Sequence, residues 1–421
     1  MKKSFLKIAN EYDFKYKPQL RQKKVTSEIV NPEAIRDQIE KFDFKEPMSR
    51  ENLINKISEL LDEYSLHVTH PRYLGLFNPS VSGIAVAADA MVAAYNPQLA
   101  VWSHAPLACE IERMVLSQLS KKIGFNPSTS FSCFTSGGQE SNLTATITAL
   151  THIFKDFDLH GVRSIEGQPI FYVSEQAHHS FHKVAHAVGL GRNAVKEVPV
   201  NSRMQLNIDR LRAMIIQDRA KGGKPFMIAA TAGTTAAGIV DPLNEMADIA
   251  NEFNLWYHVD AAWGGGALLS SLTSKYLNGI DQADSVTWDA HKWLSVPMGA
   301  GMFFCKNGEA VNKSFRITTS YMPSPENDTI DPYSTTLQWS RRFIGLKVFM
   351  TIAEVGWPEI DERIGSQFKV GQYLRVGLKD QGYTIHNNTL LPVICFNHRQ
   401  IASNELLRKN KSARSILAIY S

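Results

Sequence analysis

The sequence predicts an α/β protein whose largely parallel sheet is covered by helices on both faces. From about residue 130, short apolar runs alternate with helical patterns, as in repeated strand–helix–strand crossovers. These runs lack a polar face, which is typical of strands buried on both sides. The strands are expected at residues 131–135, 169–174, 225–233, 255–263, 285–290 and 300–306.

Helices are expected between these strands and near the N-terminus. Apolar residues recur at helical spacing in three segments that separate the strands: 142–154, 178–189 and 243–254. The first eighty residues are polar and contain a helical pattern that starts near Ser49 or Asn52.

The chain after residue 345 has the pattern of a separate small α+β unit. Residues 363–382 favour a helix, and residues 383–387 and 391–398 favour strands. We therefore expect three parts: an N-terminal helical segment (1–80), a large domain (81–345) and a small C-terminal domain (346–421).

Composition and charge argue against several classes of protein. Of the 421 residues, 44% are hydrophobic, which is ordinary for a soluble globular chain. A net charge of +4 without a long Lys/Arg stripe argues against a nucleic-acid partner. The most apolar run, residues 83–95, is short and contains Asp89, so we expect a buried helix and no membrane span. The basic N-terminus lacks an apolar core, so no cleaved signal is expected.

The four cysteines are widely separated, at Cys109, Cys133, Cys305 and Cys395. They form no CxxC pair and no Cys/His cluster, so the sequence predicts no metal site. Reduced thiols in a cytoplasm fit this pattern best.

Lys292 is the most unusual residue of the predicted sheet region. It lies in "DSVTWDAHKWLSVPMGAGMFF" (284–304), after a buried strand and beside two tryptophans. Most lysines extend their ammonium group to the surface along an apolar stem, and Lys292 could do the same. Alternatively, its amine forms a Schiff base with a carbonyl compound.

Three further features occur at the ends of the predicted strands. Asp260 closes a buried strand and either caps the next turn or holds a cationic group. "TSGGQES" (135–141) is either a plain tight turn or a phosphate-binding turn at a helix N-terminus. His178 either opens a helix as an exposed residue or lies flat over an aromatic cofactor.

Because the carboxyl ends of parallel strands meet at one edge, these four features are expected to lie together. An amine for an aldehyde, an acid for a ring nitrogen, a phosphate seat and a stacking imidazole match the chemical groups of pyridoxal 5'-phosphate. The sequence therefore predicts a site for this cofactor.

The chain resembles the group II amino-acid decarboxylases that depend on pyridoxal phosphate, which include glutamate, aromatic amino-acid and diaminobutyrate decarboxylases. The resemblance covers most of the chain, and the pair "HVDAAW" and "DAHKW" is its most specific part. The matching segments are 70–79, 101–112, 135–142, 176–180, 232–242, 258–265, 289–293 and 340–349.

The resemblance implies a fold-type I enzyme with a mostly parallel seven-stranded sheet and a small C-terminal domain. It implies that Lys292 carries the cofactor and that Asp260 pairs with the pyridine nitrogen. His178 would stack on one face of the ring, and Ala262 would pack on the other. His291 would contact the phosphate or the substrate carboxylate.

Further roles come from the same resemblance. Gly138 and Gln139 would bind the phosphate, and Thr235, or less directly Thr234, would touch the ring oxygen or support Asp260 and His178. Tyr321, in a loop over 318–336, would donate a proton during the reaction. Substrate contacts would come from Phe77, Gln98 and Arg341.

The chain departs from its relatives at three places. Asp289 stands where some relatives have an asparagine that binds phosphate. Gln98 and Ala100 replace bulky apolar residues of the aromatic decarboxylases, which favours a small polar or acidic substrate. Relatives also continue beyond the strand expected at 391–398, so the small domain is expected to be shorter than theirs.

The expected reaction is decarboxylation of an L-amino acid to an amine and CO2 by a cytoplasmic homodimer with sites at the subunit interface. The alternatives are transamination, oxidative conversion to an aldehyde, carbon–sulfur lysis, and a binding protein without activity. No membrane association and no metal are expected.

Overall fold

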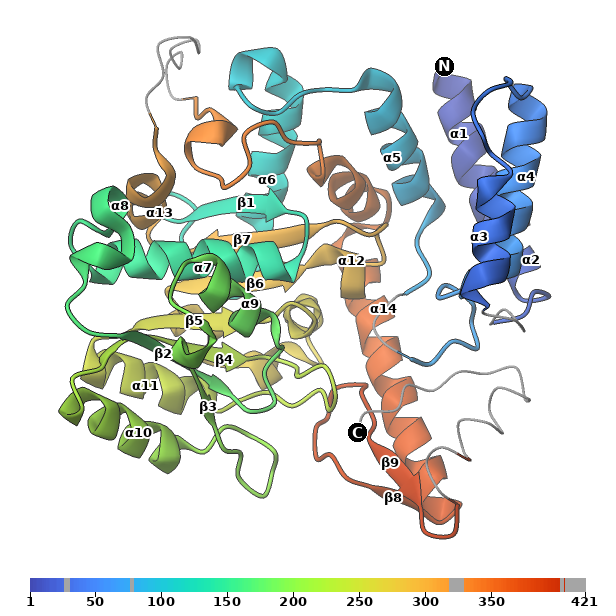
Figure 1. The fold of residues 1–421 in the computed structure, drawn as a ribbon. Coiled ribbons are helices and arrows are strands. Elements are labelled where there is room, and N and C mark those ends of the chain that lie inside the picture. The colour runs from blue at the N-terminus through green and yellow to red at the C-terminus, as the bar shows by residue number, and fades with distance from the viewer. Residues whose placement is uncertain (26–30, 76–78, 318–328, 402–404, 406–421) are drawn as a thin grey trace.

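The computed structural model describes residues 1–25, 31–75, 79–317, 329–401 and 405. Its main body is a central sheet with helices on both faces, and the first helices lie at one side of that body (Figure 1). No helix among the described residues combines the length and the apolar character that a membrane crossing requires.

The sheet has seven strands in the order β1-β7-β6-β5-β4-β2-β3. Only β7 runs antiparallel to its neighbours, so the prediction of a mostly parallel seven-stranded sheet is confirmed. The strands are β1 (Phe131–Thr135), β2 (Pro169–Ser174), β3 (Val195–Val198), β4 (Lys224–Thr231), β5 (Trp256–Asp260), β6 (Ser285–Asp289) and β7 (Gly301–Cys305).

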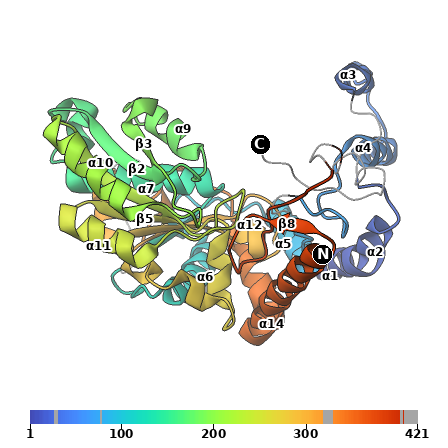
Figure 2. The ribbon, with the colours of Figure 1, turned by 90° about the horizontal axis from the view of Figure 1, so that it is seen from below.

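Two apolar cores lie on opposite faces of this sheet. Alternate residues of one strand enter different cores: Ile170 and Tyr172 face one, Phe171 and Val173 the other. The second core includes residues of α7 (Gly138–Ile153), α9 (Ser180–Ala187) and α13 (Gly308–Phe315). The first includes residues of α6 (Pro106–Ile123), α10 (Ile208–Ala220) and α11 (Leu243–Phe253), and Figure 2 shows the sheet edge-on between helices.

The strand β3 was not predicted from the sequence. It is only four residues long, and its middle residues, Lys196 and Glu197, are charged. Since it pairs only with β2, it forms an edge of the sheet, where such charges remain in solvent. The apolar pattern that marks a doubly buried strand is therefore weak there.

The N-terminal part is helical, as expected. Ser49 caps α4 by accepting the N–H of Asn52, which confirms the predicted start. The bounds are α1 (Lys2–Glu11), a π-helical turn (Tyr12–Tyr16), α2 (Lys17–Leu20), α3 (Pro32–Glu40) and α4 (Arg50–Tyr64), followed by α5 (Gly83–Tyr95). α5 is the helix predicted from the most apolar run, and α1 lies beside it (Figure 1).

The C-terminal part begins with α14 (Gly345–Asp380), which is longer than the predicted helix. Gly356, with φ +72°, interrupts its helical geometry just before Pro358. The antiparallel strands β8 (Tyr383–Ile385) and β9 (Phe396–His398) follow, and β9 is shorter than expected. This confirms a small α+β arrangement over the described C-terminal residues.

The remaining elements are short. They are α8 (Phe157–His160), α12 (Ala290–Trp293) and the 3-10 turns at Trp102–His104, Gly161–Ser164, Arg192–Ala194, Gly264–Leu269, Ser274–Leu277, Ile280–Gln282 and Pro332–Ser334. Of these, α12 matters most for the site, because it contains Lys292.

Candidate functional site

The ends of the parallel strands bring the predicted side chains to one edge of the sheet. β4, β5 and β6 run parallel, with Thr231 opposite Asp260 and Asp260 opposite Thr287. The last residue of β6 is Asp289, and α12 starts directly after it. Asp260, Asp289 and Lys292 therefore meet where such sheets bind ligands.

The Lys292 side chain stays close to the sheet. Its Nζ lies 3.1 Å from Oδ2 of Asp289, and the side chain is only 24% exposed. The next residue, Trp293, stacks on Trp263 with ring centroids 4.8 Å apart and an interplanar angle of 8°. The ion pair with Asp289 and the stacking of Trp293 hold this short helix at the strand ends. The amine therefore stays at the sheet edge and is mostly shielded from solvent.

Asp289 is turned toward cationic groups. Its carboxylate is buried and lies 3.7 Å from Nε2 of His291 as well as against Lys292. Burial raises the pKa of Asp289, while Lys292 and His291 act in the opposite direction. The negative charge of Asp289 beside a bound phosphate would thus be reduced by the Lys292 amine or by a proton.

The glycine turn before α7 lies directly against Asp289. A Cβ on Gly138 would approach Oδ2 of Asp289 to 3.1 Å and Cβ of Ala262 to 3.2 Å. A Cβ on Gly137 would lie 3.9 Å from the His291 ring. Gly138 opens α7, and the first amides of a helix have no intrahelical partner, so a small anion could bind there. Gln139 follows at an exposed position of the first turn.

Asp260 is buried, and both of its oxygens accept N–H groups. Oδ2 accepts the side-chain amide of Asn142 at 2.9 Å, and Oδ1 accepts the backbone N–H of Ala262 at 3.0 Å. The backbone carbonyl of Ala262 in turn accepts the N–H of Asp289 at 2.9 Å. The two carboxylates are therefore positioned through one shared turn.

A chain of hydrogen bonds fixes the orientation of Asn142. The indole N–H of Trp256 can only donate, and it donates to Ser285 Oγ at 2.9 Å. The Ser285 hydroxyl also lies 2.8 Å from Nδ1 of His258; we assign the proton of the neutral ring to Nε2, because Nε2 faces the side-chain oxygen of Asn142, which can only accept.

His258 consequently donates from Nε2 to Oδ1 of Asn142 at 3.1 Å, and Thr287 donates to the same oxygen at 2.7 Å. With its side-chain oxygen bound by His258 and Thr287, Asn142 presents its NH2 group to Asp260. Burial lowers the pKa of His258 to about 4, so its ring is neutral, as this pattern requires.

Sequence reasoning missed Asn142, His258 and Thr287. A signal existed for two of them. His258 precedes Asp260 by two residues and so shares its side of β5, and Asn142 lies one turn after Gly138 on α7. Polar residues at apolar periodic positions indicate a buried network, but the sequence does not say which groups they meet.

His178 lies near this network and is exposed in the single chain. Burial of part of its ring lowers its pKa; Lys292 acts in the same direction, and Asp260 and Asp289 oppose the shift. Its Nδ1 accepts the N–H of Ser180 at 3.2 Å, which orients the ring at the start of α9. A stacking role for His178 stays a prediction.

The remaining cofactor residues take positions around the same edge. Nδ1 of His291 accepts the N–H of Ala300 at 3.2 Å. Thr234 is buried, and its hydroxyl accepts the N–H of Ile239 at 3.1 Å, so it supports the turn after β4. Thr235 is the next, half-buried residue of that turn.

The substrate residues are described only in part. Arg341 is buried, and its guanidinium donates to Glu112 at 2.6 Å; Glu112 also accepts the N–H of Gly345 at the start of α14. In the described chain Arg341 thus has a structural role, and its substrate contact stays a prediction. Gln98 is exposed, and Phe77 and Tyr321 lie outside the described residues.

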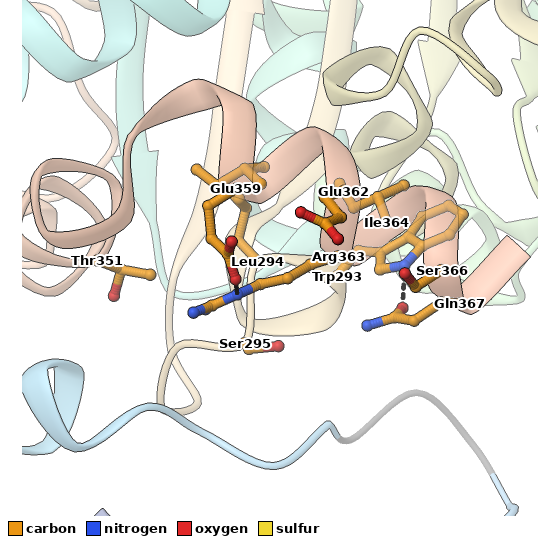
Figure 3. A pocket seen from close by; sticks show the side chains of 11 residues that line it. Trp293, Leu294, Ser295, Thr351, Glu359, Glu362, Arg363, Ile364, Ser366 and Gln367 are labelled. Atoms are coloured by element: carbon orange, nitrogen blue, oxygen red, sulfur yellow. Dashed lines mark hydrogen bonds and ion pairs between the residues drawn. The ribbon is translucent and has the colours of Figure 1, made fainter.

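A separate cavity of about 330 Å³ lies on the other side of α12. It is lined by Trp293, Leu294, Ser295, Thr351 and part of α14 (Figure 3). Arg363 donates to Glu359 at 2.9 Å, one turn away along α14. Lys292, Asp260 and His178 do not line this cavity, so it is distinct from the site at the strand ends.

The arrangement fits pyridoxal phosphate. A lysine amine, a buried carboxylate held as an acceptor, an imidazole and a glycine turn at a helix start lie at one edge. No other residue type is needed to bind an aldehyde, a ring nitrogen, a ring face and a phosphate.

Comparison with known proteins agrees with a pyridoxal-phosphate site. The family model for the pyridoxal-dependent decarboxylase conserved domain matches residues 32–399. An L-aspartate decarboxylase of Metarhizium robertsii is 31% identical over 352 residues, covering 82% of this chain and 70% of that protein. An aromatic-L-amino-acid decarboxylase of Bacillus atrophaeus is 27% identical over 393 residues, covering 92% and 80%.

A solved structure supports the fold. The crystal structure of mouse CSAD superposes with a TM-score of 0.90 at 24% identity, covering 100% of this chain and 91% of that one.

Replacing Asn142 with leucine should slow the reaction at this site about 10- to 100-fold. The variant removes a hydrogen bond to a charged group, worth about 1.5–3 kcal/mol, and each 1.4 kcal/mol is a factor of ten. Turnover and the visible absorbance of bound cofactor should be measured together, because a change in the environment of Asp260 alters both.

The matched control is Thr146→Val, one turn further along α7, where the buried hydroxyl bonds only the carbonyl of Asn142. This control should keep the absorbance and most of the activity. Normal turnover and an unchanged spectrum in Asn142→Leu would show that the amide does not position Asp260.

Proposed function

Since the chain belongs to the pyridoxal-dependent decarboxylase family, we propose that Lys292 bears its cofactor and that its substrate is a small acidic or polar L-amino acid. The chain is a pyridoxal-phosphate-dependent amino-acid decarboxylase, as its relatives are. The observation that most supports the residue assignment is the meeting of Lys292, Asp260 and Gly138 at one sheet edge.

Each proposed residue has a physical task. Lys292 binds the cofactor aldehyde through its amine, and the amides at Gly138 and Gln139 hold the phosphate. Asp260, fixed by Asn142 and Ala262, accepts the N–H of the pyridine ring. When bound, pyridoxal phosphate takes up the electron pair released as the Cα–CO2 bond breaks.

Other residues would select decarboxylation and complete it. His178, Ala262 and Thr235 would restrain the ring, so that the substrate carboxylate can be held perpendicular to it. His291 would contact the phosphate or that carboxylate. Tyr321 would donate the proton to Cα, a role proposed from the family resemblance because this residue lies outside the described segments.

The proposed substrate class follows from Gln98 and Ala100. The Gln98 side chain donates to Ser340 Oγ at 3.0 Å and accepts the N–H of Ala100 at 2.9 Å, so polar groups occupy this segment. A pocket without large apolar side chains forfeits roughly 1.5–3 kcal/mol for each lost contact with an aromatic substrate. The relative with the higher identity is named for aspartate, and the other for aromatic amino acids.

We also propose a homodimer with the site at the subunit interface. On α4 the exposed side chains of Leu53, Ile57 and Leu61 recur every fourth residue and form one apolar stripe. In Figure 2, α3 and α4 extend away from the main body. An exposed apolar stripe on such a segment favours association, and a second copy of the chain is the partner that the family resemblance implies.

A cytoplasmic location is proposed as well. All four cysteines are unpaired in the structure, which is typical of proteins kept in a reducing compartment. Fractionation of cells that produce the protein would test this location.

Lys292→Ala should lose both the visible absorbance of covalently bound cofactor and the release of CO2. No other amine in the described chain has the same contact with Asp289 at the sheet edge. Borohydride reduction followed by peptide mapping locates the modified lysine. Lys306→Ala, an exposed lysine after β7, is the control and should keep both signals. A reducible adduct that persists in Lys292→Ala would disprove the assignment.

The purified enzyme should release CO2 faster from aspartate, glutamate or diaminobutyrate than from tyrosine or dihydroxyphenylalanine. The physical reason is the polar Gln98 segment described above. Competition assays with these five compounds, with identification of the amine formed, give the relative kcat/KM values. A clear preference for the two aromatic compounds would refute the substrate class, and a keto acid, aldehyde or sulfide product would refute the reaction.

Sedimentation equilibrium should show a dimer at micromolar concentration. Glutamate at both Ile57 and Leu61 should shift the equilibrium toward the monomer, because two charges would enter the apolar stripe. Asn55→Glu, on the opposite side of α4, is the control that adds a charge outside the stripe. A fully active monomer would contradict the dimer and its shared site.

A further inference from the structure

Two histidines and a glutamate outside the proposed cofactor site point toward one another. His179 is the N-cap residue of α9, and His182 follows three positions later, so both lie on one face of the helix. Glu197 comes from the edge strand β3. One ligand atom from each of the three side chains lies within 4.8 Å of the other two.

The three side chains lie close together, and one pair of them is in direct contact. Nε2 of His182 lies 2.9 Å from Oε1 of Glu197, and the ring centroids of His179 and His182 are 6.1 Å apart. An exposed ion pair would account for His182 and Glu197, and such a pair contributes at most about 1 kcal/mol. It would not account for a second imidazole directed to the same point.

We propose that His179, His182 and Glu197 form a binding site for a divalent transition-metal ion, with Zn²⁺ as the preferred ion. Two imidazole nitrogens and one carboxylate oxygen are a common zinc ligand set, and they leave a fourth position for water. Magnesium and calcium prefer shells made of oxygen, so the two imidazoles disfavour them. His182 and Glu197 are partly exposed, which leaves the site open to an ion from solvent.

The sequence alone did not indicate this site. No closely spaced Cys/His motif marks it, and Glu197 is fifteen residues from His182 on a strand that was not predicted. Only the packing of α9 against β3 places the carboxylate beside the two imidazoles. The expectation of no metal is thus replaced by a specific hypothesis.

The position of the site gives it a structural consequence. His179 directly follows His178, and the N–H of Ser180 donates to Nδ1 of His178. A bound ion would join the first turn of α9 to β3 and so restrain the backbone that presents His178. The site lies outside the proposed decarboxylation machinery, and its existence does not depend on the proposed function.

The test uses the untagged holoenzyme after removal of metal ions. Equilibrium dialysis with Zn²⁺, together with competition against a chromophoric chelator, gives the number of ions bound and their affinity. We expect one zinc per chain, with His179→Ala, His182→Ala and Glu197→Gln each weakening binding at least tenfold. The circular dichroism of each variant should stay unchanged, which shows that it is folded.

Two histidine variants make the outcome specific. His160→Ala removes an exposed imidazole of α8 and should not alter zinc binding. His186 lies one turn beyond His182 on α9, so His182 and His186 could bind an ion as a pair without Glu197. The variant His186→Ala tests this alternative.

Three results would overturn the proposal. These are no zinc binding by the wild-type chain, wild-type affinity in both His182→Ala and Glu197→Gln, or a loss in His186→Ala as large as that in His182→Ala. Each result is independent of turnover, so failure of the decarboxylase assignment would not be mistaken for failure of the metal site.

Discussion

Two carboxylates buried at the ends of neighbouring parallel strands govern the structure of the sheet edge that forms the candidate site. Asp260 closes β5 and Asp289 closes β6, and both side chains are buried. A buried carboxylate is costly unless hydrogen bonds or cations compensate it. The two residues are compensated differently, since Asp260 accepts two N–H groups while Asp289 faces Lys292 and His291. The two carboxylates are therefore held differently: Asp260 is fixed as a hydrogen-bond acceptor, and Asp289 balances the charge of the lysine.

The sequence predicted the parts of the fold that repeat a simple pattern. Strands buried on both faces, such as β2, are continuous apolar runs, and their bounds agreed with the prediction. The start of the helix α7 was predicted four residues too late, because its start at Gly138 is set by a glycine turn that could equally have been a loop. The edge strand β3 was missed because its charged residues contact solvent. Local patterns thus define buried elements better than they define ends and edges.

The candidate site was predicted at the level of single residues, and its connections were not. Lys292, Asp260, Gly138 and His178 were proposed because each closes or follows a predicted strand, and their roles stay predictions. The hydrogen-bond chain from Trp256 to Asn142 could not be predicted, because it depends on groups from β5, β6 and α7 that only the fold brings together. For the same reason the ion pair of Arg341 with the buried Glu112 was not predicted, and its substrate contact stays a prediction. A sequence shows which groups are costly to bury, but the partner of each group is a property of the packing.

The position of Asp289 explains how a carboxylate can lie beside a phosphate seat. Its Oδ2 lies 3.1 Å from the Lys292 amine, so the ion pair lets both charges remain partly buried. With the proposed phosphate at the turn of Gly138, Asp289 would meet additional negative charge. Burial already raises the pKa of Asp289, and a nearby phosphate shifts it in the same direction, so the carboxyl can accept a proton. His291, whose pKa is lowered by burial, lies 3.7 Å from the same oxygen and is a second group with which such a proton can be shared. An asparagine at position 289 would serve a phosphate without this exchange, but it would leave the Lys292 ammonium without its compensating charge.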